Sequence, residues 1–143
     1  MPFPAFATYA AAVRVTGEVT PETQDGEYES GIARIDGEAW HIRTARNTRT
    51  KSDAFTAFWR RAEDGTTMPF GDDDPARGLL VFVAHQDGRG AFRFTRAHLA
   101  DLGITSRRKP GKRGFRVYPS WCTGLNAQAT VTQRAQAPAF TEH

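Results

Sequence analysis

Positively charged side chains concentrate in two segments of this chain that contain no acidic residue. The segments run from residue 40 to 51 and from residue 102 to 116. The rest of the chain holds nine of the 19 lysines and arginines against all 16 acidic residues. We expect an electropositive surface for anions if the two segments meet in space; two separate solvated loops are the alternative. The ten basic residues are Arg43, Arg46, Arg49, Lys51, Arg107, Arg108, Lys109, Lys112, Arg113 and Arg116.

The second segment contains a glycine-flanked basic loop over residues 109–116. Two glycines let the backbone approach a ligand closely, and the planar guanidinium group of an arginine fits two phosphate oxygens. The phosphate-binding loop of nucleotide hydrolases requires G-x-x-x-x-G-K-[ST], and this pattern is absent. The loop therefore predicts phosphate binding by Lys112, Arg113 and Arg116 without nucleotide hydrolysis. A flexible loop that binds nothing is the alternative.

The first segment leads from an expected strand into an expected helix that begins near Ser52. The first turn of a helix has unpaired N–H groups and a partial positive charge, and both favour anions. Arg43 is expected to face outward, and Thr48 and Lys51 lie next to the helix start. We predict phosphate binding by Arg43, Arg46, Thr48 and Lys51. Pairing of Arg43 with an acid across the sheet is the alternative.

Carboxylates before and within the first expected hairpin are the best candidates for catalysis. Metal-dependent nucleases hold Mg²⁺ with carboxylates and place a lysine beside them. Here such a set would be Glu27 or Glu29 with Asp36 and Lys51. The usual acid-x-lysine pair is absent after Glu38, and Asp36 fits a turn. Acidic surface loops therefore explain these residues better, and we predict no catalytic residue.

Histidine and cysteine residues offer no better site. No two of the four histidines have the i, i+4 spacing of a helical metal site, and no serine lies in a nucleophile-elbow pattern. The single cysteine, Cys122, excludes an internal disulfide and a cysteine-rich zinc site. We predict neither a metal nor a cofactor.

Helices and strands are both expected to position these residues. The pair Asp36-Gly37 between two β-type runs predicts a hairpin. An apolar stripe over residues 52–62 has helical spacing, and residues 17–30 are expected to form a loop or a short helical turn. The mixture predicts one α/β domain, bordering on α+β, with a mixed sheet flanked by helices. Further expected helices cover 5–15, 96–102 and 126–136, and expected strands cover 31–35, 39–45, 79–85, 91–94 and 115–118.

Composition indicates a folded domain. The 143 residues suffice for one hydrophobic core, and 39% hydrophobic with 11% aromatic content argues against disorder. No apolar run is long enough to cross a bilayer, and the N-terminus lacks the pattern of a signal peptide. We expect a cytoplasmic protein that has no membrane partner; its oligomeric state is left open.

Several motifs resemble the MepB family. The resemblance covers about residues 27–140 of a single domain spanning 1–143. It implies a restriction-endonuclease-like α/β fold and nucleic-acid binding, while nuclease activity is in doubt in the family. Cys122 departs from the pattern, because the family tends to have aspartate there. The matching motifs are Arg43-Thr44-Ala45 with Thr48 and Lys51, Phe55-x-x-Phe58-Trp59, Gly90-x-Phe92-x-Phe94, residues 111–119 with Trp121, and Asn126-x-Gln128-Ala129 with Thr132, Gln133 and Gln136.

These observations together predict a non-catalytic protein that binds DNA or RNA. The phosphate groups are common to both nucleic acids, so the sequence does not distinguish them. A Mg²⁺-dependent nuclease or other phosphodiester-processing enzyme is one alternative. A protein-interaction module whose basic face meets an acidic partner is the other. The residues expected to contact phosphate are Arg43, Arg46, Thr48, Lys51, Lys112, Arg113 and Arg116.

Overall fold

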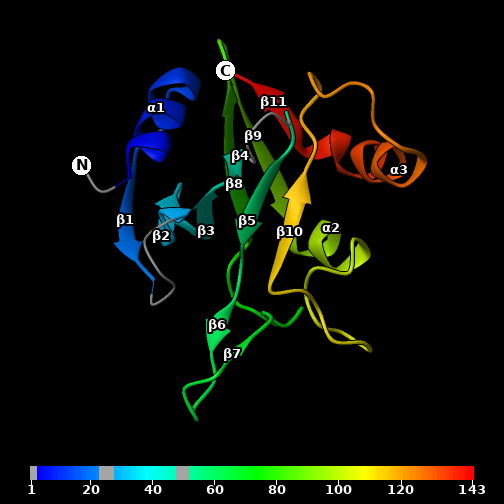
Figure 1. The fold of residues 1–143 in the computed structure, drawn as a ribbon. Coiled ribbons are helices and arrows are strands. Elements are labelled where there is room, and N and C mark those ends of the chain that lie inside the picture. Colours follow the sequence, from blue (N-terminus) through cyan, green and yellow to red (C-terminus); the bar gives the residue numbers. More distant parts are fainter. Residues whose placement is uncertain (1–2, 23–27, 48–51) are drawn as a thin grey trace.

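A six-stranded mixed sheet forms the centre of the fold (Figure 1). The computed structural model describes residues 3–22, 28–47 and 52–143. Neighbouring strands of the sheet are antiparallel, except that β3 and β8 are parallel. The strand order is β1 (Gly17–Pro21), β2 (Gly31–Ile35), β3 (Glu38–Thr44), β8 (Gly78–His85), β9 (Gly88–Thr95) and β11 (Phe140–Glu142).

A smaller antiparallel sheet of three strands lies against the large one. Its order is β10 (Gly114–Val117), β5 (Ala54–Ala57) and β4 (Arg46–Asn47). Strands β6 (Arg60–Arg61) and β7 (Thr67–Met68) pair with each other. Figure 1 shows them as an arm extending beyond the ends of β5 and β10.

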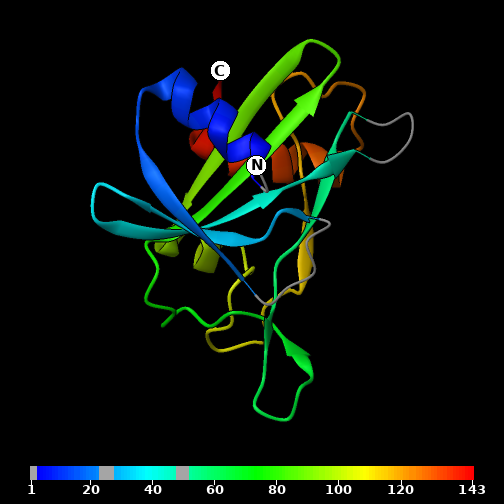
Figure 2. The ribbon, with the colours of Figure 1, turned by 90° about the vertical axis from the view of Figure 1, so that its left-hand side faces the viewer.

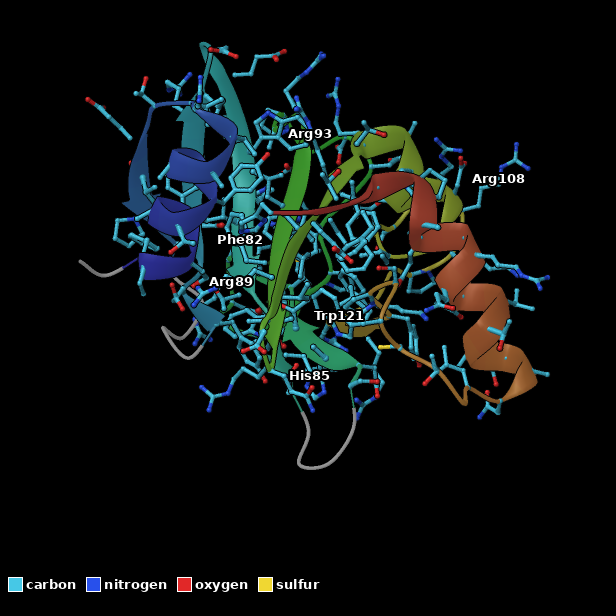
Figure 3. The ribbon with its side chains drawn as sticks, turned by 90° about the horizontal axis from the view of Figure 1, so that it is seen from above. Phe82, His85, Arg89, Arg93, Arg108 and Trp121 are labelled. Carbon is cyan, nitrogen blue, oxygen red and sulfur yellow. The ribbon has the colours of Figure 1, made fainter. Side chains whose placement is uncertain are left out.

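Two hydrophobic clusters cover opposite faces of the large sheet. Helix α1 (Pro4–Val13) covers one face, where Phe6 packs with Phe82. The small sheet and helix α2 (Arg96–Asp101) cover the other face through a cluster that includes Phe58. Helix α3 (Ala127–Gln136) and the short helix η2 (Ala137–Ala139) follow on this second side, and the view from above separates α1 from α2 and α3 (Figure 3).

Local sequence signals explain several boundaries. Asp36 and Gly37 have φ angles of 51° and 79°, as a tight hairpin turn between β2 and β3 requires. The hydroxyl of Thr95 caps α2 by accepting from the His98 N–H at 3.2 Å. The side chain of Asn126 caps α3 in the same way. The predicted hairpin and the helices near residues 96 and 126 are confirmed.

The helix predicted over residues 52–62 is wrong. Ala54, Thr56 and Phe58 are at most 1% exposed, whereas the residues between them are half-buried. A burial period of two belongs to a strand, and β5 pairs with both β4 and β10. The apolar spacing was compatible with both periods, and tertiary pairing selected the strand.

The loop predicted over residues 17–30 is also wrong in its first part. Residues Gly17–Pro21 form β1, which pairs along its whole length with β2. Figure 2 shows β1, in dark blue, descending from the end of α1. The prediction of one α/β domain with a mixed sheet flanked by helices is confirmed. Among the described residues, no helix has the length and apolar character needed to span a membrane.

Candidate functional site

The two acid-free segments meet in the three-stranded sheet. The first segment supplies β4 and the second supplies β10, and β5 lies between them. In the strand register, Arg46 and Arg116 are both direct partners of Phe55. Cross-strand partners have their side chains on the same face of a sheet, so the two arginines flank Phe55.

This face of the small sheet is its solvent side. The opposite face carries Ala54, Thr56 and Val117, which are all fully buried against the large sheet. On the solvent side Arg46 is exposed and Phe55 is half-buried. The alternation of the strands therefore directs the basic side chains outward and the apolar ones into the core.

An ion pair holds Arg116 in place. Its Nη1 lies 2.9 Å from Oδ2 of Asp53, and the side chain of Arg116 is 39% exposed against 9% for Asp53. A ligand approaching from solvent therefore meets the guanidinium group before the carboxylate. Asp53 orients the arginine and offsets part of its charge.

Lys112 and Arg113 lie where the second segment enters β10. Both side chains are exposed. The backbone N–H of Lys112 donates to the Ile104 carbonyl at 2.8 Å, and Nε of Arg113 donates to the Thr67 carbonyl at 3.2 Å. The basic loop is thus anchored through its backbone and through one arginine, while Lys112 remains exposed.

A polar groove of about 550 Å³ runs beside β10, between α2 and α3. Lys112 and Arg116 line it from the strand side, and Gln128 and Thr132 line it from α3. Asp101 at the end of α2 is its acidic member. Two of the predicted phosphate-binding residues therefore share one concave surface.

Arg108, from the same basic segment, lies elsewhere. Figure 3 shows its side chain projecting beyond α2, away from the small sheet. The neighbouring Arg107 forms an ion pair with Asp72, Nε to Oδ2 at 2.8 Å. The charge of Arg107 is therefore offset locally by Asp72.

The expectation that Arg43 faces outward is wrong. Its side chain is fully buried, and Nη1 donates to Oε1 of Glu22 at 2.7 Å and to the Ile42 carbonyl at 2.8 Å. Arg43 does point to the face of β3 opposite Trp40, but that face is covered by Phe58, over whose ring the guanidinium lies at 5.1 Å. Arg43 is instead paired with an acidic residue, Glu22, which was the alternative expected from the sequence.

A buried ionic network extends from Arg43 through Glu22 to His41 and Asp74. Nδ1 of His41 lies 3.0 Å from Oε1 of Glu22, and Nε2 lies 2.8 Å from Oδ2 of Asp74. Burial alone would lower the pKa of His41, but the hydrogen bonds to Asp74 and Glu22 outweigh it and the pKa is raised. Burial opposes ionisation of Glu22 and Asp74 too, yet their pKa values are lowered because His41 bonds to both.

Sequence reasoning missed this network. Glu22, His41 and Asp74 come from distant positions in the chain, and no sequence motif connects them. His41 itself is buried. Its two carboxylate partners became visible only when β1, β3 and the loop before β8 were placed together.

Three of the predicted residues, Thr48, Lys51 and the catalytic candidate Glu27, lie outside the described residues. The carboxylate of Glu29 accepts from the Ala5 N–H at 3.4 Å, and Asp36 lies in the exposed hairpin turn. Within residues 3–22, 28–47 and 52–143, no group of three metal-ligating side chains could hold a metal ion.

Comparisons with known proteins agree with this architecture. The crystal structure of MepB superposes with a TM-score of 0.84 at 29% sequence identity, covering 96% of this chain and 95% of that one. No curated protein sequence matches the chain significantly. A family model described as MepB-like matches residues 22–142. The chain therefore belongs to the MepB-like family.

Proposed function

We propose that this protein binds nucleic acid through a basic surface, defined as Arg46, Lys112, Arg113 and Arg116. The observation that carries the proposal is the strand register, in which two basic segments far apart in sequence supply arginines on either side of Phe55. Phosphate oxygens are recognised by such groups, and arginine offers two parallel donors to each phosphate.

The uneven distribution of charge along the chain supports the proposal. Outside the two basic segments the chain holds 16 acidic and nine basic residues, so its net positive charge of +3 comes from the segments themselves. The exposed basic residues of these segments on the small sheet would attract an anionic polymer to that sheet. The groove beside β10 adds a concave surface next to Lys112 and Arg116.

Binding at this surface is expected to depend on salt and on the charges of the basic loop. For the double variant Lys112→Ala/Arg113→Ala we expect weaker binding of labelled oligonucleotides in an anisotropy titration. The slope of log affinity against log salt should shrink by about 0.9 for each lost phosphate contact on duplex DNA. Unchanged affinity and slope in this variant would remove the proposal.

A matched control removes a charge from the face of the large sheet that α1 covers. Arg93 is exposed on β9, and its guanidinium carbon lies 4.6 Å from the centroid of the Trp40 ring, in the cluster that packs against α1. Arg93→Ala should keep both the affinity and the salt slope. Equal losses in Arg93→Ala and in the loop variant would indicate an effect of net charge alone and would contradict a localised surface.

The same titration separates the competing proposals. A Mg²⁺-dependent nuclease would shorten the labelled oligonucleotide when Mg²⁺ is added. A module for an acidic protein would bind an acidic polypeptide such as polyglutamate and fail to bind oligonucleotides at equal charge. We expect binding without cleavage.

A further inference from the structure

We propose that the basic surface takes single-stranded nucleic acid, with bases stacked on an aromatic strip along β5. The strip is defined as Phe55 and Trp59 together with the arginines beside them. This inference rests on the proposed function and narrows it to one form of the ligand. The arginines of the strip are Arg46, Arg116 and Arg61.

An alternating burial pattern starts in β5 and continues past its end. Residues 54, 56 and 58 are buried, and residues 55, 57 and 59 are half-buried. Phe55 lies on β5, and Trp59 follows two residues after this strand ends at Ala57. The pattern places both rings on the less buried side of the chain.

Each ring has cationic groups next to it. Arg46 and Arg116 flank Phe55 on the neighbouring strands, and strands lie about 4.8 Å apart. The guanidinium carbon of Arg61 lies 5.2 Å from the centroid of the Trp59 ring. Exposed bases stack on aromatic rings and on guanidinium planes, while the cations hold the phosphates between them.

The ring of Phe55 is held in position by its surroundings. A Cβ atom at Gly114 would lie 2.5 Å from Cζ of Phe55, so the ring occupies the space that this glycine leaves open over β10. Tyr28 meets the ring edge-on, with the centroids 6.2 Å apart. A ring that is already fixed loses little conformational freedom on binding, and this favours affinity.

Duplex recognition does not fit this surface as well. In a duplex the base faces are covered by their neighbours, and the major groove is read by a helix or a two-stranded ribbon. Helices α2 and α3 carry one arginine each, and α1 carries no basic residue. The β6–β7 arm is a ribbon with basic β6 residues, but Glu63 and Asp64 lie between its strands and would repel phosphates.

The decisive test compares single strands with a duplex of the same sequence. We expect the wild-type protein to bind a single strand of about ten nucleotides at least about tenfold more tightly than the duplex. Phe55→Leu keeps an apolar side chain but removes the ring, and it should weaken single-strand binding about tenfold. Phe55→Tyr keeps the ring and should retain the wild-type affinity.

A control variant and a second ring variant distinguish a loss of binding from a loss of folding. Tyr9→Leu removes a half-buried ring that packs against Phe82 on the other face of the large sheet, and it should not change binding. Trp59→Leu should also weaken single-strand binding, and circular dichroism checks that this variant is folded.

Two outcomes would overturn the inference. One contradicts only the preference for single strands, and the other also contradicts nucleic-acid binding. Equal or tighter binding of the duplex, with Phe55→Leu and Trp59→Leu neutral, would remove the single-strand preference and leave nucleic-acid binding in place. Failure of every oligonucleotide to bind at low salt would remove the proposed function as well.

Discussion

At the scale of single residues, Arg43 and Arg46 differ in solvent exposure although they are close in sequence. They are three positions apart in the same basic segment. Arg43 is fully buried beside Glu22, and Arg46 is exposed on β4 next to Phe55. The desolvation cost of a buried guanidinium is offset only when a carboxylate meets it, so Arg43 is committed to structure. Arg46 keeps its charge at the surface.

The ionic network around His41 predicts a specific dependence of stability on pH. The pKa of His41 is raised by Asp74 and Glu22, so its stabilising contribution is complete below the ordinary histidine pKa of about 6.5. That contribution is lost as the pH rises through the higher folded-state value. Glu22 and Asp74 have lowered pKa values, so their contribution is present above about pH 4.5 and is lost as the pH falls.

We expect the wild-type protein to exceed His41→Gln in free energy of unfolding most clearly between about pH 5 and 6.5. The difference should shrink as the pH rises further. Urea unfolding of both proteins at several pH values measures it. A difference that stays constant or grows toward high pH would contradict the protonated bridge. Arg43 and Arg60 are the other charged groups that act on these carboxylates.

At the scale of secondary-structure elements, α3 completes the small sheet through one side chain. Gln136 is 2% exposed and accepts from the Tyr118 N–H at 2.9 Å. Its Nε2 donates to the Arg116 carbonyl, also at 2.9 Å. The amide therefore pairs with backbone groups at the free edge of β10, as a further strand would. This contact positions α3 beside the groove.

Gln136→Ala is expected to lower the free energy of unfolding by about 2 kcal/mol, because two backbone groups lose their partner. Gln128→Ala on the same helix is the control. The Gln128 side chain is exposed, so its loss should change stability by less than about 0.5 kcal/mol. Urea unfolding measures both changes. Similar values for the two variants would show that the Gln136 amide does not secure the edge of β10.

At the scale of the whole molecule, the large sheet lies between helix α1, which supports the fold, and the small sheet, which carries the proposed basic surface. Stability and binding should therefore be separable by mutation. The polar network of His41 lies between the two sheets, where β3 faces Phe58 and Phe70.

Phe6→Ala tests this separation. Phe6 is 6% exposed and packs edge-on against Phe82, so its truncation should cost about 3 kcal/mol of unfolding free energy. Oligonucleotide affinity of the folded variant should equal that of the wild type, because Phe6 packs in the cluster on one face of the large sheet, whereas the small sheet packs in the cluster on the other face. A loss of affinity in this variant, measured where circular dichroism shows it folded, would contradict the separation.

Local signals in the sequence determined much of the fold. The Asp36-Gly37 turn, the caps at Thr95 and Asn126 and the apolar run of β8 depend on neighbours within a few residues, so they could be predicted. The strand at residues 54–57 could not be predicted in this way. Its apolar spacing suits both a helix and a strand, and pairing with β4 and β10 decided between them.

For the candidate site, the sequence by itself determined that the chain has two acid-free basic segments and belongs among MepB-like proteins. Only the tertiary structure decided that Arg46 and Arg116 flank one aromatic ring, while Arg43 is buried against Glu22. The physical reason is that charge is a property of each residue, whereas solvent exposure depends on what packs against it. Strand pairing between distant segments determines which side chains are covered.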